Sequence, residues 1–473
     1  MCSPEVEPFA KTGGLGDVLG SLPKTLAKMG VDVRVMMPLY GVIPDKYREE
    51  MRFVGKATCP VAWREKYMGV FEMVQDGVIY YFIDNEYYFK HGDIYNGGHD
   101  LERFSYFSRA CLESLKLIDF FPDIIHCHDW QSASIPALWE HFYSSQDKYK
   151  DIKTVFTIHN LKFQGVHGVG HINDFLGLPN SYFSYDRLGF GNDAANMLKG
   201  GIVFSNFVTT VSPTYAGEIM TPEYGEGLDY CLRERQNKLG GIINGIDYTR
   251  YSPKINENIA FQYDAYSASE GKANNKQFIQ EKLGLPIEKE VPLIAIISRL
   301  TSQKGLDIIL YALEELLQED VQLVVLGTGD SEYENAFKHH AWHHKDKLSA
   351  NIYFSNELSH QIYAGSDMFL MPSLYEPCGL GQLIALSFGS VPIVRETGGL
   401  KDTVFSYNEA TKEGNGFSFA PYTAHDMMFT IRRALQLYEE KKEWNRIIEN
   451  GMLADYSWGT SAQHYINIYE GLK

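Results

Sequence analysis

Short, apolar, β-rich runs alternate with helical patterns along both halves of the chain, and this alternation constrains the fold more than any other feature. Such runs are typical of parallel strands buried under helices, so the sequence predicts an α/β fold. In the first half we expect strands over 31–37, 123–127, 153–159 and 207–212. In the second half we expect them over 291–298, 321–327, 352–354, 368–373 and 391–394.

The length of the chain indicates two domains, because 473 residues exceed the roughly 250 to 300 that one hydrophobic core usually holds. A polar, turn-rich and poorly periodic stretch, 244–276, separates the halves as a linker or a mobile loop would. We therefore expect one domain over 1–245, a hinge near Gly245, and a second domain over 246–455. Ligands of open α/β sheets bind beyond the carboxyl ends of the strands, so two such edges facing each other would form a deep cleft.

The composition narrows the class of protein. Hydrophobic residues at 44% and charged residues at 22% are globular values. No apolar run approaches the roughly 18 residues of a membrane span, and nothing before Lys11 resembles a signal peptide, so we expect a protein that stays inside a cell and has no membrane partner. A net charge of −17 argues against nucleic acid as a partner but not against a neutral polymer. The six cysteines are scattered without a C-x-x-C pair, and we expect reduced thiols.

A glycine turn in "PFAKTGGLGDVLG" places Gly13, Gly14 and Gly16 between Lys11 and Asp17, ahead of a stretch with helical spacing. Backbone N–H groups at such a turn can hold an anion at the start of a helix. The glycines match neither a dinucleotide fingerprint nor a P-loop, and a flexible loop with a surface lysine explains them equally well. One side of the expected helix is apolar and consists of Leu19, Leu22, Leu26 and Met29.

Two further segments of the second half carry polar groups behind buried strands. Arg299 and Lys304 follow the run that ends at Ser298, and a guanidinium with an ammonium suits a diphosphate. Solvated surface cations are the alternative. Glu376 lies on a loop ahead of a glycine-rich helix start, where its carboxylate could bind hydroxyls while the amides of Gly379 and Leu380 hold an anion. The alternative is a charge that stabilises the helix dipole.

In the first half, "HCHDW" and "TIHN" end two strands with His128, Asp129 and His159. We expect His126 and His128 to point to opposite faces of their strand, which argues against a zinc site. The chain also lacks a D-x-D tripeptide, a carboxylate pair that could hold a nucleotide diphosphate through a divalent ion. We therefore expect no metal. The charge of a leaving group must then be met by helix N-termini and by Lys11, Arg299 and Lys304.

Taken together, these segments resemble the bacterial glycogen synthases and plant starch synthases, glycosyltransferase family 5. The resemblance covers nearly the whole chain, with the segments in family order and at similar spacing. The segments that carry it are "KTGGLGDV", "HDW", "TIHN", "TTVSPTYAGEI", "INGIDY", "SRLTSQKGLD", "YAGSD", "EPCGL" and "VPIVRETGGLKDTV".

The resemblance implies two Rossmann-like domains facing across a deep cleft, the GT-B type of glycosyltransferase fold. It implies transfer of glucose from a nucleotide diphosphate to the non-reducing 4-hydroxyl of an α-1,4-glucan, with retention at the anomeric carbon. ADP-glucose is the commoner donor in the family, and the resemblance implies no metal or other cofactor. The segment 456–473 would be a helix that returns to the first domain. The implied location is the cytoplasm, or the plastid stroma if a transit peptide has been removed.

The resemblance also assigns roles to residues of this chain. The groups that it implies for the diphosphate are Lys11, Gly13, Gly14, Gly16, Asp17, Arg299 and Lys304. Those implied for the glucosyl site are Asp129, His159 and Asn244. Glu376 would bind the sugar hydroxyls, beside a donor contacted by Cys378, Gly379 and Leu380. The residues implied in catalysis are Glu376, His159, Asp129, Arg299 and Lys304. The leaving phosphate would take the acceptor's proton on the same face, with the His159 carbonyl near the developing positive charge.

The chain departs from the family pattern in several places. Leu374 and Ser387 stand where the family usually has arginine, while Ile384, eight positions after Glu376, favours the synthases over a larger neighbouring family with a glutamate there. The segment 1–9 carries two prolines and leaves little to pair as a first strand. We expect that the numbering starts a few residues late and that a chain extended upstream melts at a higher temperature. Equal melting temperatures would contradict this.

Three alternatives stay open. The chain could use UDP-glucose, or be another retaining transferase with sucrose or a small sugar as substrate. It could be a glucan-binding regulator without activity, although such a protein need not keep the diphosphate cations. An NAD oxidoreductase built on "LGTGD" is the most distant, because that segment lacks the third glycine of the fingerprint.

Overall fold

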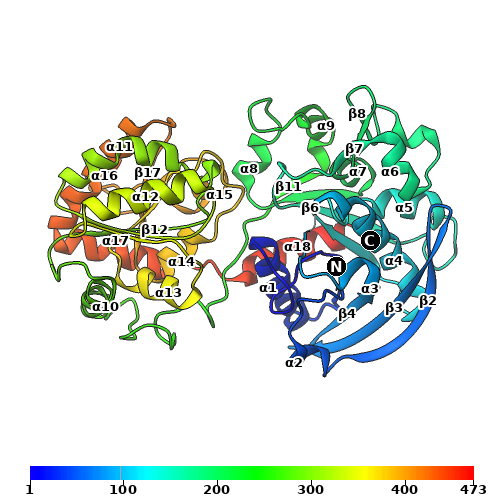
Figure 1. The fold of residues 1–473 in the computed structure, drawn as a ribbon, viewed down its shortest axis with the longest axis horizontal. Coiled ribbons are helices and arrows are strands. Elements are labelled where there is room, and N and C mark those ends of the chain that lie inside the picture. The colour runs from blue at the N-terminus through cyan, green and yellow to red at the C-terminus, as the bar shows by residue number, and fades with distance from the viewer. Residues whose placement is uncertain (96) are drawn as a thin grey trace. The chain divides into compact units, whose positions relative to one another are not determined.

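The computed structural model describes residues 1–95 and 97–473, which divide into two compact units (Figure 1). The first contains Met1–Gly245 and Trp458–Lys473, and the second contains Ile246–Ser457. Each unit has its own hydrophobic core. Within the described part of the chain, no helix is long and apolar enough to cross a membrane.

The second unit is built on one parallel sheet of six strands in the order β14-β13-β12-β15-β16-β17. Its strands are β12 (Leu293–Ile297), β13 (Gln322–Leu326), β14 (Leu348–Asn351), β15 (Met368–Met371), β16 (Val391–Arg395) and β17 (Phe417–Phe419). In chain order this is 3-2-1-4-5-6, the doubly wound order of a Rossmann fold. The order reverses between β12 and β15, so the loops after these two strands border the position where such sheets bind ligands.

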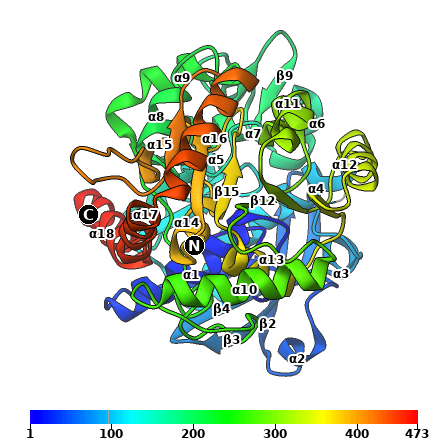
Figure 2. The same cartoon turned by 90° about the vertical axis from the view of Figure 1, so that its left-hand side faces the viewer.

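Helices connect these strands and cover the sheet. They are α10 (Ala268–Leu283), α11 (Leu306–Gln318), α12 (Ser331–His343), α13 (Asn356–Gly365), α14 (Gly381–Ser387), α15 (Gly398–Thr403), α16 (Ala424–Glu439) and α17 (Lys441–Leu453), with a 3-10 turn, η4, over Ser302–Lys304. Figures 1 and 2 both show α10 beside α13, and α14 packs against α17. The crossovers β12-α11-β13 and β13-α12-β14 run in the same direction across the sheet, which places α11 and α12 on one face.

The first unit contains two groups of four strands. One has the order β1-β4-β3-β2, in which only β1 and β4 are parallel, and the other is the parallel set β11-β10-β6-β5. Their bounds are β1 (Arg34–Pro38), β2 (Arg52–Val61), β3 (Arg64–Gln75), β4 (Val78–Asp84), β5 (Ile124–His128), β6 (Lys153–Ile158), β10 (Phe207–Thr210) and β11 (Leu239–Gly241). A separate small sheet is formed by β7 (Val166–Gly168), β8 (Gly189–Phe190) and β9 (Ala194–Asn196).

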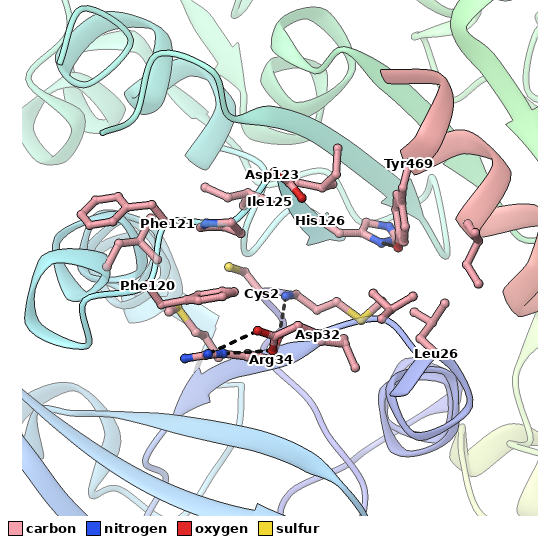
Figure 3. A pocket seen from close by; sticks show the side chains of 18 of the residues that line it. Cys2, Leu26, Asp32, Arg34, Phe120, Phe121, Asp123, Ile125, His126 and Tyr469 are labelled. Carbon is pink, nitrogen blue, oxygen red and sulfur yellow. Dashed lines mark hydrogen bonds and ion pairs between the residues drawn. The ribbon is translucent and has the colours of Figure 1, made fainter. Parts of the chain in front are cut away.

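The first residues of the chain join the two groups of strands. Cys2 forms parallel bridges with both Met36 of β1 and Cys127 of β5, so the expectation that this segment leaves little to pair is wrong at Cys2. A cavity of about 470 Å³ lies beside this segment (Figure 3). Its lining includes Cys2 and the first residues of β1 and β5, Arg34 and Ile124. It therefore lies at the amino ends of these strands, opposite the edge where α/β sheets bind ligands.

The helices of the first unit include one from the far end of the chain. They are α1 (Gly14–Lys28), α2 (Asp45–Arg48), α3 (Glu86–Phe89), α4 (Asp100–Leu117), α5 (Ile135–Phe142), α6 (Val169–Leu176), α7 (Met197–Phe204), α8 (Pro213–Glu218), α9 (Asp229–Glu234) and α18 (Trp458–Leu472). The last, drawn in red in Figure 1, packs against α1 and buries Trp458, Ala462 and Tyr465 in the core of this unit. Its Tyr469 hydroxyl lies 2.7 Å from Nδ1 of His126.

Eight of the nine predicted strands are confirmed, and the errors have local causes. The run 352–354 is not a strand, because β14 pairs with β13 through Leu348–Asn351 and ends there. The stretch 244–276 is not all linker, since α10 begins at Ala268. Leu19, Leu22 and Leu26 of α1 are buried, but Met29 is 40% exposed because the helix ends one residue before it.

Candidate active site

An ion pair lies between the two loops that border the switch point of the second unit. Lys304 ends η4 after β12, and Glu376 follows β15 by five residues. Lys304 Nζ lies 2.6 Å from Glu376 Oε2, with the two side chains only 14% and 8% exposed. The Ser373 hydroxyl donates to the same oxygen at 3.0 Å. The sequence analysis selected both charged residues, and the fold brings them into direct contact.

The two loops are fixed to each other by further hydrogen bonds. The Leu374 N–H donates to the Gln303 carbonyl at 2.9 Å, and Gln303 Nε2 donates to the Tyr375 carbonyl at 3.2 Å. Arg395, at the end of β16, donates from Nη1 to the Leu374 carbonyl at 2.6 Å. Arg395 was not predicted as a site residue, although a cation at the end of a buried run such as "VPIVR" indicates a charge at the edge of the sheet where ligands bind. These bonds hold the loop that carries Glu376.

The backbone around Glu376 rests directly on the start of α15. A Cβ on Gly398, whose φ is +44°, would lie 1.9 Å from the Glu376 carbonyl oxygen, and one on Gly399 would lie 2.0 Å from that of Cys378. The Gly399 N–H donates to the Glu376 carbonyl at 3.1 Å. Only glycine permits this approach, so Gly398 and Gly399 position the glutamate, a role that the sequence analysis did not assign to "TGG".

The remaining groups predicted near the donor lie on or beside the same loops. Cys378 is buried, and Gly379 (φ +75°) and Leu380 directly precede α14. Arg299 is exposed two residues after β12, and no described residue accepts a hydrogen bond from its guanidinium. At the two departures from the family pattern, Leu374 is 40% exposed and Ser387 donates to the Tyr251 carbonyl at 2.8 Å.

In the first unit, the predicted lysine of the glycine turn is paired with carboxylates. Lys11 Nζ lies 2.6 Å from Asp17 Oδ1 and 3.3 Å from Glu7 Oε2, all three side chains being partly exposed. A Cβ on Gly16 would lie 2.6 Å from that of Lys11, so the glycine gives the lysine room to lie over the first turn of α1. The local sequence therefore fixes where the cation lies.

Part of the glycine turn already binds a carboxylate of the chain itself. Glu5 accepts hydrogen bonds from the backbone N–H groups of Thr12 at 2.6 Å and Gly13 at 3.1 Å, and also from the hydroxyl of Tyr95. The Gly13 amide is thus engaged with Glu5. The amides of Gly14 and Leu15 have no acceptor among the described residues. Sequence reasoning missed Glu5, whose signal was an acidic residue just ahead of the turn.

Asp129 and His159 meet at the carboxyl ends of the neighbouring strands β5 and β6. Asp129 has a left-handed backbone (φ +56°). Its Oδ1 accepts a hydrogen bond from the His159 N–H at 2.7 Å, and its carboxylate also accepts one from the Asn160 N–H. The His159 carbonyl and the Asn160 N–H belong to the same trans peptide and point in opposite directions, so the bond from the Asn160 N–H turns the His159 carbonyl away from Asp129. Burial raises the pKa of Asp129 to about 7 and lowers the pKa of His159 to about 3.

The expectation that His126 and His128 point to opposite faces is wrong. Residues two apart along a strand share a face, and the two rings stack with their centroids 4.2 Å apart. His128 Nδ1 lies 3.0 Å from His159 Nε2, and His126 Nε2 lies 2.6 Å from the hydroxyl of Thr157. Burial lowers the pKa of both rings well below the ordinary range. Because it contacts His159, His128 is a further functional candidate, and it was not among the residues predicted for the site.

Asn244, the third residue predicted at the glucosyl site, also belongs to this edge of the first unit. It follows β11 by three residues and is buried. Its side-chain carbonyl has no hydrogen-bond partner within the described part of the chain. A buried acceptor without a partner is costly, which is consistent with a ligand hydroxyl donating to it.

Family models match both units. The starch synthase catalytic domain matches residues 1–234, and the domain of glycosyl transferases group 1 matches residues 276–452. The glycogen synthase of Clostridium novyi (strain NT) is 52% identical over 472 residues, covering 99% of this chain and 98% of that protein. The glycogen synthase of Geobacillus stearothermophilus is 51% identical over 468 residues, covering 99% and 96%.

Solved structures give the same answer. The catalytic domain of starch synthase IV from Arabidopsis thaliana, bound to ADP and acarbose, matches with a TM-score of 0.92 and 35% identity, covering 100% of this chain and 98% of that one. A sucrose-phosphate synthase from Thermosynechococcus elongatus shares the fold, with a TM-score of 0.61 at 16% identity. The predicted fold class, two Rossmann-like domains of the GT-B type, is confirmed. The chain belongs to the family of bacterial glycogen synthases and plant starch synthases, glycosyltransferases that elongate glucans.

Proposed function

We propose that this chain transfers glucose from ADP-glucose to the non-reducing 4-hydroxyl of an α-1,4-glucan, with retention at the anomeric carbon and without a metal ion. The buried Lys304–Glu376 pair carries the proposal. A carboxylate suits hydrogen bonds from sugar hydroxyls, and an ammonium beside it suits the phosphate on the same sugar. Side by side at a switch point, the two groups match the two ends of a sugar phosphate.

The charge of the leaving diphosphate is met by cations and backbone amides in this proposal. Arg299 and Lys304 follow β12, and Lys11 with the free amides of Gly14 and Leu15 lies at the start of α1. Preorganised cations and amides stabilise developing negative charge without reorganising during the reaction. The same groups make a divalent ion unnecessary. The choice of an adenine nucleotide is supported by the ADP bound in the related starch synthase IV structure.

Retention follows from attack on the same face that the leaving group departs from. The bond between the anomeric carbon and the phosphate oxygen breaks, the acceptor 4-hydroxyl oxygen bonds to that carbon, and its proton passes to the departing phosphate. The His159 carbonyl then stabilises the developing positive charge. Asp129 is a positioning residue in this scheme. Its hydrogen bond from the Asn160 N–H orients the peptide that bears the His159 carbonyl.

One assay tests the proposal: radiolabelled ADP-glucose or UDP-glucose is incubated with glycogen primer and EDTA. We expect label in the polymer with ADP-glucose, unchanged by EDTA, and products whose new linkage is α by NMR. Faster incorporation from UDP-glucose would contradict the proposed choice of ADP-glucose as donor. Strict dependence on magnesium would contradict the metal-free mechanism. Incorporation from neither donor would contradict the proposed activity.

A further inference from the structure

We propose a binding site for a divalent transition-metal ion on the second unit, formed by Glu314 of α11 with His340 and His344 at the end of α12. His340 Nδ1 lies 2.9 Å and His344 Nε2 lies 3.2 Å from the same oxygen, Glu314 Oε1. All three atoms lie within 4.8 Å of one another. The site is independent of the proposed glucosyl transfer.

Two of the three separations fit a tetrahedral ion. With metal–ligand bonds of about 2.0 to 2.1 Å, two ligands of such an ion lie about 3.3 to 3.4 Å apart. The two separations at Glu314 are within a few tenths of an ångström of this value, and the two histidine nitrogens lie within 4.8 Å of each other, close enough for ring rotations to bring all three atoms around one ion. Two imidazoles and one carboxylate, with water in the fourth position, select zinc and similar borderline ions rather than magnesium.

The backbone holds the ligands in place. The His344 N–H donates to the His340 carbonyl at 2.9 Å, which keeps the two rings one helical turn apart even though α12 ends at His343. Lys347 Nζ donates to the carbonyls of Leu317 at 2.9 Å and Glu319 at 2.7 Å, which ties the end of α11 to the segment after α12. The two helices that supply the ligands are therefore fixed relative to each other.

Glu314 differs from its acidic neighbours in its partners. Glu315 of α11 and Glu319, just after the helix, bind Arg432 at 2.7 and 2.8 Å. Glu314 has no lysine or arginine partner within the described residues, and its contacts are the two histidines. An ion here would tie α11 to α12 on one face of the sheet. Glu314 lies eight residues into α11, about 12 Å along the helix from its start beside Lys304, so occupancy should change stability rather than catalysis.

The test uses untagged full-length protein stripped with EDTA. Titration calorimetry with zinc chloride should show one site per chain with micromolar affinity. Thermal melts with zinc at about 100-fold the Kd should rise by a few degrees, whereas magnesium should have no effect. Cobalt should give the visible absorption of a tetrahedral centre. Glu314→Gln, His340→Ala and His344→Ala should each weaken zinc binding more than tenfold with kcat unchanged.

The chain provides a matched control on the same helix. His339 and His343 are also four residues apart and exposed, with ring centroids 4.6 Å apart, but no described carboxylate contacts them. The double variant His339→Ala/His343→Ala should bind zinc as the parent does. Loss of binding in this control would overturn the assignment, and so would zinc affinity that survives Glu314→Gln or is absent from the parent. In that case the contacts at Glu314 are only an ion pair with protonated histidine. Failure of the glucosyl transfer assay would leave the calorimetric, melting and absorption readouts unaffected.

Discussion

Each unit contains a lysine that is ion-paired with a carboxylate, but the charges around the two lysines differ. Lys11 lies among Asp17, Glu7 and the nearby Glu5, so carboxylates outnumber the cation. Lys304 is paired with Glu376, and the exposed Arg299 on the same loop has no carboxylate partner among the described residues, so cations outnumber the carboxylate. The second cluster should attract a diphosphate strongly, whereas in the first one the ammonium is already compensated.

The two regions also differ in how their groups titrate. The first unit holds the neutral, stacked histidines His126 and His128 and an Asp129 whose pKa is raised to about 7 by burial. The site of the second unit rests on a lysine and a glutamate with a direct ion pair. We therefore expect binding of the leaving group to depend mainly on the second unit, and sensitivity to acid mainly on the first.

The largest effect is expected from breaking the buried pair. Lys304→Ala and Glu376→Ala should each lower kcat by about 100- to 1000-fold, roughly 3 to 4 kcal/mol of transition-state stabilisation. Glu376→Gln keeps the shape and the acceptor oxygen and should lose less than Glu376→Ala. Steady-state kinetics with ADP-glucose measure this, with circular dichroism as the control for folding. Near-normal rates in a folded Lys304→Ala variant would place the leaving-group site elsewhere.

Acid should destabilise the first unit more than the second. A histidine whose pKa is lowered on folding binds its proton more readily in the unfolded chain, whose pKa is about 6.5, so stability falls as the pH drops below this value. Asp129 has the opposite effect between about pH 7 and pH 4, and over this window it roughly offsets His159. His126 and His128 then decide the sign.

We expect the first unit to lose on the order of 3 to 4 kcal/mol between pH 7 and pH 5, about 2 kcal/mol for each of the two histidines. Hydrogen exchange resolved by peptide measures this, after correction for the intrinsic exchange rate at each pH. Peptides of β5 and β6 should lose protection at pH 5, while those of β12 and β13 serve as the control. Equal changes in both units would mean that His126 and His128 do not outweigh His360, a buried histidine of the second unit whose pKa is lowered to about 4.

A smaller effect is expected at the first lysine. Lys11→Ala should reduce kcat/KM for ADP-glucose by about threefold to tenfold, or 0.7 to 1.4 kcal/mol, because its charge is shared with Asp17 and Glu7. Kinetics at low and at moderate ionic strength measure this loss. A loss as large as that of Lys304→Ala would show that the nearby carboxylates do not weaken Lys11, and the contrast between the two clusters would then be wrong.

The sequence could predict the parts of the site that follow directly from a strand. Arg299, Lys304 and Glu376 come after apolar runs whose ends are visible in the chain, and parallel strands end at one edge of a sheet. The contact between Lys304 and Glu376 was not predictable from spacing alone. It depends on the order β12-β15, which brings two segments 72 residues apart together.

The groups that sequence reasoning missed act over long range or through the backbone. Glu5 binds amides of a turn that it precedes, and Gly398 matters because of a carbonyl that approaches it from another loop. Neither shows in periodicity. The strands β2 and β3 were missed because most of β2 is exposed or half-buried and the buried residues of β3 are interrupted by partly exposed ones. The face error at His126 came from applying the wrong period to a strand.

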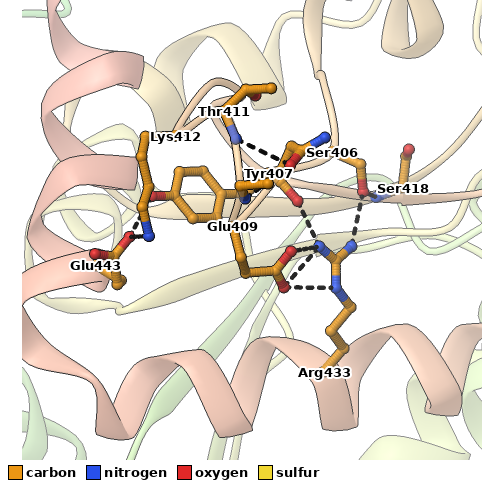
Figure 4. A network of polar contacts seen from close by, with 10 residues as sticks. Ser406, Tyr407, Glu409, Thr411, Lys412, Ser418, Arg433 and Glu443 are labelled. Carbon is orange, nitrogen blue, oxygen red and sulfur yellow. Dashed lines mark hydrogen bonds and ion pairs between the residues drawn. The ribbon is translucent and has the colours of Figure 1, made fainter.

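The smallest effect is expected at an exposed network in the second unit, shown in Figure 4. There Arg433 contacts Glu409 at 3.0 Å, with side chains 31% and 50% exposed. Exposed pairs of this kind contribute about 0.2 to 1 kcal/mol, because water and salt screen them. Glu409→Gln should therefore lower the free energy of unfolding by less than about 1 kcal/mol and leave kcat unchanged. Urea unfolding and the transfer assay measure both quantities. Because this pair also joins a cation to a glutamate in the same unit, a loss of activity here would mean that charge anywhere in the unit affects turnover. An unchanged kcat would attribute the large effect at Lys304 to its position, where the loops that follow β12 and β15 meet.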